Sequence, residues 1–361
     1  MAKSLDIQFP VAGVQRRMGV RATAEKGGPF PTPYSCNVRI EDQIASRLRG
    51  GSFTGISAGS RPSIVYRDRT LTFSGRAITA SRVGASTDTT LSSDVSDAMR
   101  PTLFQLSEAG EQGGSVVALV PHKDNSLLGF TANETWIQLG DPLNGPRRRI
   151  SDQVGIIGAN AWCVAHDTVY FLSSRGLYSV GADGSNLNAI SEDVLPEDLA
   201  GITDTACTLT YQHSDRGVYV HKTGTDWFFD TAREGFWPFD TSTEDSHVLI
   251  GPIKIGNRGA YGRLQRLVGE IAAESAEVTW RVIVADTAEN AADHGTIAVE
   301  TALLGGDISS FYRSSGTWYE EINNSAYPRV RGQWMVLWLS AEDPWAFESI
   351  SADIEPSGKW R

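Results

Sequence analysis

Cysteine is scarce in this sequence, and its three copies, Cys36, Cys163 and Cys207, are far apart and odd in number. Cys163 and Cys207 each fall on the first strand of a repeated unit, which favours buried thiols over a disulfide. No CxxC pair and no group of cysteine with histidine has the spacing of a zinc site. The sequence therefore predicts no metal and no cofactor.

Long hydrophobic runs are also absent. No apolar stretch approaches the roughly 18 residues that a transmembrane helix needs. Residues 1–6 read MAKSLD and contain no apolar core of a secretory signal. The sequence predicts a protein that neither spans a membrane nor leaves the cell by an ordinary signal, and that is made and assembled in a cytoplasm.

Recognisable catalytic motifs are missing as well. There is no phosphate-binding loop, no G-x-G-x-x-G fingerprint, and no pair of carboxylates placed as the acid and nucleophile of a glycosidase. Residues 55–59 match the G-x-S-x-G nucleophile elbow, but neither the strand nor the helix of that motif flanks them. Residues 314–318 resemble the repeated turn of sialidase-like propellers, but lack its Asp and its spacing. We expect a protein that is not an enzyme.

Charge is unevenly distributed along the chain, whose net charge is −11. Residues 1–60 hold eight Lys and Arg against four Asp and Glu, residues 61–271 hold 18 against 25, and residues 272–361 hold six against 14. An acidic body repels phosphate, which argues against tight binding of nucleic acid. The basic part is expected to dock onto something acidic, such as a neighbouring subunit. The arginines expected to make this contact are Arg16, Arg17, Arg21, Arg47 and Arg49.

Residues 1–60 also differ from the rest in pattern. The stretch GGPFPTP at residues 27–33 excludes a helix and a central strand, and RLRGGS at residues 47–52 is equally irregular. The sequence predicts an extended N-terminal arm that includes one short strand. A disordered tail is the alternative.

After residue 60 the sequence contains many predicted short strands. Residues 167–180 read DTVYFLSSRGLYSV, two runs of β-branched and aromatic residues around a turn, which is the pattern of a tight hairpin. Similar hairpins occur at residues 127–139 and 217–230. Each follows an apolar strand and a polar turn that contains His122, His166 or His213. These histidines are 44 and 47 residues apart, which is the period of a β-propeller blade.

Further copies extend this repeat. A shorter copy covers residues 64–79, a weaker one covers residues 247–271, and strands continue to the end of the chain. The sequence predicts an all-β protein, a β-propeller of about six or seven blades at residues 61–361, preceded by the arm at residues 1–60. A separate β-sandwich at residues 272–361 is the alternative for the last part.

The repeated histidines have a structural interpretation. Three histidines could bind one metal ion if they converged, but equivalent positions in successive blades are expected to lie on a circle, many ångströms apart. We expect each His or Asp to stabilise its own turn through bonds to the backbone.

One basic run, Arg147-Arg148-Arg149, follows Asn-Gly-Pro at residues 144–146. The sequence predicts an exposed inter-strand loop that is solvated or pairs with acidic residues of a partner. Contact with DNA phosphates is the alternative.

Three segments near the C-terminus carry a family resemblance. They read YPRVRGQW at residues 327–334, EDPWAFESI at residues 342–350 and PSGKWR at residues 356–361. Residues 37–39 with RLRGG at 47–51, and GIIG at 155–158 before the repeat, are further points of similarity. Together they resemble the tail-hub proteins of short-tailed phages, which are also called nozzle or stabilisation proteins.

The resemblance implies a β-propeller, six copies of which close a ring beneath the portal and adaptor. Genomic DNA would leave through this ring without specific binding, and no catalytic residues are implied. The expected location is the phage tail in the virion, with assembly in the host cytoplasm. Two other functions stay open: a tail-tip or capsid-attached propeller that binds the host surface, and a propeller glycoside hydrolase.

Overall fold

The computed structural model describes residues 3–9, 32, 34–36, 38–41, 44–47, 63–108, 110–122, 125–181, 183–195, 198–240, 245–257, 260–273, 275–319 and 324–359. Contacts divide the chain into two units. Unit 1 comprises Met1–Ser52 and Thr225–Arg361, and unit 2 comprises Phe53–Gly224. Strands dominate the described residues, so the predicted all-β class is confirmed.

Four successive four-stranded antiparallel sheets, in which each strand pairs with the next along the chain, lie between residues 63 and 239. The first contains β5 (Ser63–Tyr66), β6 (Arg69–Ser74), β7 (Ala77–Ala80) and β8 (Thr102–Phe104). The second contains β9 (Val116–His122), β10 (Ser126–Thr131), β11 (Thr135–Leu139) and β12 (Arg147–Ser151). The third contains β13 (Trp162–Ala165), β14 (Thr168–Ser173), β15 (Gly176–Gly181) and β16 (Asn188–Ala189). The fourth contains β17 (Thr208–Gln212), β18 (Gly217–His221), β19 (Asp226–Asp230) and β20 (Gly235–Phe239), and the boundary between the units falls after β18.

These sheets confirm the predicted repeat, because a four-stranded meander is the unit of a propeller-like fold. The hairpin expected at residues 167–180 is β14–β15, with Ser173 opposite Gly176 and two residues in the turn. The preceding turn also has two residues, of which His166 has a φ of 55°. Histidine is one of the non-glycine residues that tolerate this left-handed conformation.

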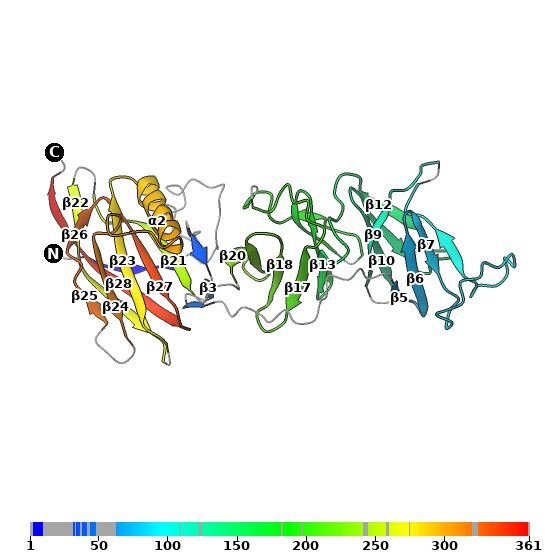
Figure 1. Cartoon of the computed structure of the whole chain (residues 1–361), viewed down its shortest axis with the longest axis horizontal. Coiled ribbons are helices and arrows are strands. Elements are labelled where there is room, and N and C mark those ends of the chain that lie inside the picture. Colours follow the sequence, from blue (N-terminus) through cyan, green and yellow to red (C-terminus); the bar gives the residue numbers. More distant parts are fainter. Residues whose placement is uncertain are drawn as a thin grey trace. The chain divides into compact units, whose positions relative to one another are not determined.

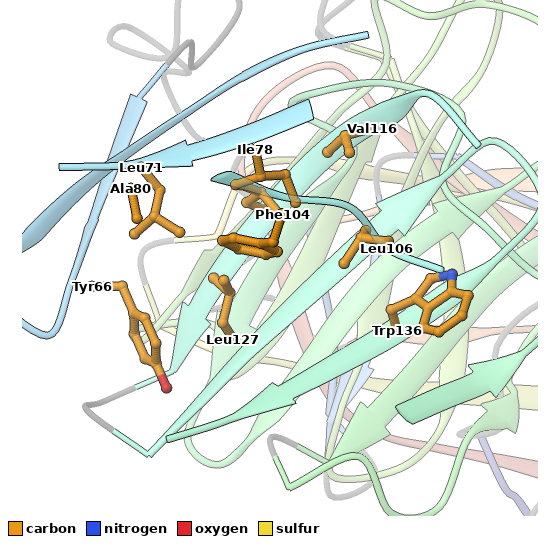
Figure 2. Close-up of a cluster of buried hydrophobic side chains, with 10 residues drawn as sticks. Tyr66, Leu71, Ile78, Ala80, Phe104, Leu106, Val116, Leu127 and Trp136 are labelled. Atoms are coloured by element: carbon orange, nitrogen blue, oxygen red, sulfur yellow. The ribbon is translucent and has the colours of Figure 1, made fainter. Parts of the chain in front are cut away.

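The first two sheets pack face to face through a buried cluster (Figure 2). The cluster includes Leu71 and Ile78 from the first sheet and Leu119, Leu127 and Trp136 from the second, all at most 2% exposed. One sheet face cannot be buried without a neighbour, so each meander depends on the next for its core.

Unit 1 contains a seven-stranded sheet and a five-stranded sheet. The seven-stranded sheet contains β1 (Lys3–Ile7), β3 (Val38–Glu41), β4 (Ile44–Arg47), β22 (Ala260–Ile271), β25 (Ser325–Ala326), β26 (Val330–Gly332) and β28 (Ala346–Lys359). The five-stranded sheet has the order β2 (Ser35–Cys36), β21 (Ser246–Lys254), β27 (Trp334–Ala341), β23 (Val278–Ala285) and β24 (Ser314–Trp318).

The helix α2 (Ala288–Leu303) covers one face of the five-stranded sheet, beside β21, β23 and β27 (Figure 1). The Thr287 hydroxyl begins this helix by accepting a hydrogen bond from the Asn290 amide at 3.1 Å. On the opposite face, the ring centroid of Trp318 lies 5.5 Å from that of Phe347 in β28. Unit 1 is therefore a β-sandwich with a helix on its outer face, and the sequence did not predict this helix.

The structure bears on three predictions: the N-terminal arm, the weaker repeat at residues 247–271 and the number of blades. The described residues before 60 form four strands that pair with β28, with β21 and with each other, so an extended arm is unconfirmed. The weaker copy at residues 247–271 is wrong, because β21 and β22 belong to different sheets. The count of six or seven blades also used strands after residue 246, and these lie in the sheets of unit 1. That count is likewise unconfirmed.

Candidate interaction surfaces

The arginine run lies on β12, the edge strand of its sheet, and not in the loop that the sequence predicted. Arg147, Arg148 and Arg149 pair with residues 138, 137 and 136 of β11. Because side chains alternate along a strand, the first and third arginines share one face and Arg148 has the other.

Arg147 and Arg149 are engaged within the chain. Arg147 donates from Nε to Gln138 Oε1 at 2.6 Å, its guanidinium lies 4.5 Å from the Phe104 ring centroid, and burial lowers its pKa. Arg149 lies within 3.5 Å of three carboxylates, those of Glu108, Glu111 and Glu134. Arg148 is the exposed member of the run. Its contact with a partner or DNA stays a prediction.

The arginines predicted to join subunits fall mostly outside the described residues, as Arg16, Arg17, Arg21 and Arg49 do. Arg47 ends β4, where its backbone pairs with Val38, and its side chain is also outside that set. The G-x-S-x-G match at residues 55–59 is not among the described residues either.

Two of the repeated histidines lie close together, so the expectation that all three are many ångströms apart is wrong. The ring centroids of His166 and His213 are 6.0 Å apart, and Tyr211 Oη lies 3.3 Å from His166 Nε2. His122 Nε2 lies 3.5 Å from Asp167 Oδ1. The cause is that the first strands of successive sheets, such as β13 and β17, contact each other. The polar turns that follow these first strands therefore lie next to each other.

An acidic pocket lies on the helix-covered face of the five-stranded sheet in unit 1 and has a volume of about 410 Å³. Its inner wall comes from three neighbouring strands, in which Ser340 of β27 lies between His247 of β21 and Thr279 of β23. Among the described residues, four carboxylates and one guanidinium, that of Arg281, line the pocket. The carboxylates belong to Asp245, Glu277, Glu342 and Asp343. The pocket therefore favours cationic groups.

His247 is the buried polar group of this pocket, with 8% of its surface exposed. Trp338 Nε1 donates to His247 Nδ1 at 3.3 Å, which places the imidazole proton on Nε2, because an indole nitrogen can only donate. That Nε2 is buried and has no hydrogen-bond partner. Burial, reinforced by Arg281 and opposed by Asp245, lowers the pKa of His247 to about 4. The pocket thus offers a neutral N–H donor beside carboxylates.

Arg281 also lines the acidic pocket. Its guanidinium lies 4.4 Å from the ring centroid of Trp338, and its Nη1 donates to Ser340 Oγ at 2.8 Å. Burial lowers the pKa of Arg281. Sequence reasoning missed this pocket, because its residues come from strand ends that only the sheet order brings together.

The described residues show neither a metal site nor a membrane-spanning helix. They contain no group of three or more His, Cys, Asp and Glu side chains placed to hold a metal ion. Among the helices in the same ranges, none has the length and apolar character to cross a membrane.

Comparisons with known proteins gave structural matches alone. No protein-family model matches the sequence, and no curated protein matches it. The extracellular domain of a hybrid two-component system from B. thetaiotaomicron is 11% identical over 55% of this chain and 26% of its own, with a TM-score of 0.33. The N-terminal domain of Nup159 is 9% identical over 95% of this chain and 96% of its own, with a TM-score of 0.32. A chain in an S. cerevisiae complex of Dbp5 with Nup159 and Gle1 is 11% identical over 64% of this chain and 67% of its own, with a TM-score of 0.31.

The chain spans about a quarter of the length of the bacterial extracellular domain that it matches, 26%. Each TM-score is below 0.5 and each identity is near 10%. These matches carry no argument about function, and the description of the fold rests on the sheets themselves.

Proposed function

We propose that this chain is a non-enzymatic structural protein of a phage virion, a tail-hub or nozzle component. Six copies would form a ring in the head-to-tail connector, in contact with portal or adaptor proteins. The observation that carries the proposal is the resemblance of the segments at residues 327–334, 342–350 and 356–361 to tail-hub proteins. A propeller-like series of four-stranded sheets is compatible with it.

The charge of the chain supports passage of DNA rather than its capture. A basic lumen would bind the phosphate backbone strongly and in a salt-dependent way, whereas an acidic wall repels it. Residues 61–361 hold 24 Lys and Arg against 39 Asp and Glu. Two of the three arginines of β12 are already engaged within the chain. DNA would pass through such a ring without specific binding.

Ring closure requires one surface of each copy to recognise a different surface of the next. The acidic pocket is a candidate for one surface, because four carboxylates line it. The basic residues Arg16, Arg17 and Arg21 are candidates for the other.

The first test is the state of assembly of the purified protein. We expect closed rings in negative-stain images and a hexamer by light scattering, and co-purification with the portal protein encoded in the same genome. A monomer at every concentration, without portal binding, would contradict the proposal.

The second test addresses the contact within the ring. Reversing Arg16, Arg17 and Arg21 to Glu should dissociate the ring, and reversing Glu277 and Asp343 to Lys in the same chain should restore it. Reversal of Arg67, Arg76 and Arg175 in unit 2 is the matched control and should leave the ring intact. Deleting residues 1–50 is a poorer test, because it also removes β1, β2, β3 and β4 from their sheets.

A further inference from the structure

A neutral groove lies in unit 1 between two edge strands, β24 of the five-stranded sheet and β25 of the seven-stranded sheet. Its volume is about 350 Å³, and Trp280, residues 314–319 and residues 324–327 line it. None of the described residues that line it carries a charge. Serine, threonine, asparagine and aromatic side chains make up its polar surface. Residues 314–318 resemble in sequence the turn of sialidase-like propellers, but they form the strand β24.

Two buried polar atoms of the groove residues have no hydrogen-bond partner. They are the indole Nε1 of Trp318, a residue only 2% exposed, and the amide Oδ1 of Asn324. The first can only donate a hydrogen bond and the second can only accept one. Buried polar groups in proteins are nearly always paired, so an unpaired donor and an unpaired acceptor on two residues that line the same groove need an explanation. A ligand that carries several hydroxyl groups would satisfy both, because a hydroxyl both donates and accepts.

Aromatic rings provide the rest of the groove. Tyr319 and Tyr327 are 39% and 63% exposed, which is high for such large rings. Trp280 lies tilted against Trp318, with ring centroids 5.8 Å apart. Gly316 makes room for this pair, because a Cβ there would lie 2.7 Å from the Trp280 ring. An amphipathic aromatic ring with a polar tip suits a ligand that has apolar C–H faces between polar groups.

We propose that this groove binds a neutral saccharide. The described lining residues carry no charge, which disfavours phosphates and acidic sugars, because these need cationic partners. An extended peptide could pair with the edge strand β24, but such a peptide mainly satisfies backbone groups. The orphaned groups here belong to side chains, which favours hydroxyl groups of a sugar. The exposed rings of Tyr319 and Tyr327 would pack against the C–H faces of pyranose rings.

The test uses the full chain on an array of neutral and acidic glycans, followed by saturation-transfer difference NMR with the best neutral ligand. We expect saturable binding to neutral glycans, with protons of one sugar face receiving most of the saturation. Tyr327→Ala and Asn324→Ala should each weaken binding at least tenfold. Tyr327→Phe should retain most of it, because the ring and not the hydroxyl contacts the sugar.

The matched control is Tyr211→Ala, which removes a tyrosine of unit 2 and should leave binding unchanged. Tyr327 is largely exposed, so its removal should not alter the circular dichroism spectrum. Binding to no neutral glycan, binding to acidic glycans alone, or equal binding by wild type and both alanine variants would overturn the proposal. The saccharide site does not depend on ring formation, so the two proposals can fail separately.

Discussion

The two units differ in how far apart in sequence their paired strands lie. In unit 2 each strand pairs with its neighbour in sequence, as in β14–β15, where two residues form the turn. In unit 1 the ends of the chain meet, and Lys3 pairs with Ile354. The ion pair between Arg39 and Asp230 joins residues 191 positions apart. Ordering distant segments costs more chain entropy than closing a hairpin. Unit 1 should therefore depend more heavily on a few long-range contacts than unit 2 does.

Substitution of Asp230 is expected to destabilise unit 1 more than any other change considered below. Its side chain is fully buried, and it accepts hydrogen bonds from Arg39 Nη2 and from the Ala232 amide, both at 2.9 Å. Asp230→Ala leaves the Arg39 guanidinium without this carboxylate in a buried place, which costs about 3–5 kcal/mol of unfolding free energy. Urea denaturation measures the loss. Hydrogen exchange should place it first in β3, β19 and β20.

Asp293→Ala is the control for that variant, because Asp293 is exposed on α2. It should change the free energy of unfolding by less than about 0.5 kcal/mol. Equal stability of the two variants would mean that the buried ion pair does not hold unit 1 together.

Leu127 offers the corresponding test in unit 2. It is 1% exposed and belongs to the cluster between the first two four-stranded sheets (Figure 2). Leu127→Ala should cost about 3 kcal/mol, since it removes apolar contacts and leaves a cavity. Hydrogen exchange should rise in the strands from β5 to β12 and remain unchanged in β22 and β28. Leu139→Ala, at a position on β11 that is 37% exposed, should cost less than about 1 kcal/mol.

The same contrast explains what the sequence could predict. Alternation and turn residues are local, so the hairpin at residues 167–180 and the strand at residues 278–285 were both recognisable. The pairing of β1 and β4 with β28, and of β2 with β21, leaves no local signal. The helix α2 does have a local sequence signal, which consists of Thr287 at its start and the alanine-rich stretch after it. The strand patterns on both sides nevertheless favoured a continued β structure.

The candidate surfaces were harder to predict than the sheets, for physical reasons. The sequence predicts a loop for the arginine run because the run follows Asn-Gly-Pro at residues 144–146, yet Arg147 and Arg149 place their guanidinium groups 4.5 Å and 5.5 Å from the centroids of aromatic rings. Long aliphatic stems let arginine occupy a strand beside apolar groups. The acidic pocket and the neutral groove each combine residues from separate strands, and only the sheet order brings them together.

His247 makes the stability of unit 1 depend on pH. In the unfolded chain its imidazole takes up a proton near pH 6.5, whereas in the folded chain the lowered pKa is about 4. Between these values the unfolded chain binds more protons, so the stability that His247 contributes is present above pH 6.5 and is lost as the pH falls toward 4. The loss between pH 7 and pH 5 should be about 2 kcal/mol.

Denaturation of the wild type and His247→Gln at several pH values measures this dependence. The variant should have a shallower decline of stability between pH 7 and pH 5, whatever its stability at pH 7. His294→Gln, at an exposed position of α2, should keep the slope of the wild type. Identical slopes in all three proteins would show that His247 titrates normally in the folded chain.

The smallest effect is expected at the cysteines of unit 2, which report whether its sheets stay closed. Burial raises the pKa of Cys163, and burial together with Asp204 raises that of Cys207 to about 11. Only the thiolate reacts with disulfide reagents. In a Cys36→Ser background at pH 8, both thiols should therefore stay unlabelled in the native protein and react fully in urea. Protection that persists in Asp230→Ala would show that unit 2 remains closed when unit 1 loosens. Rapid labelling of Cys207 in that variant would mean instead that loss of the Arg39–Asp230 ion pair also exposes this thiol of unit 2.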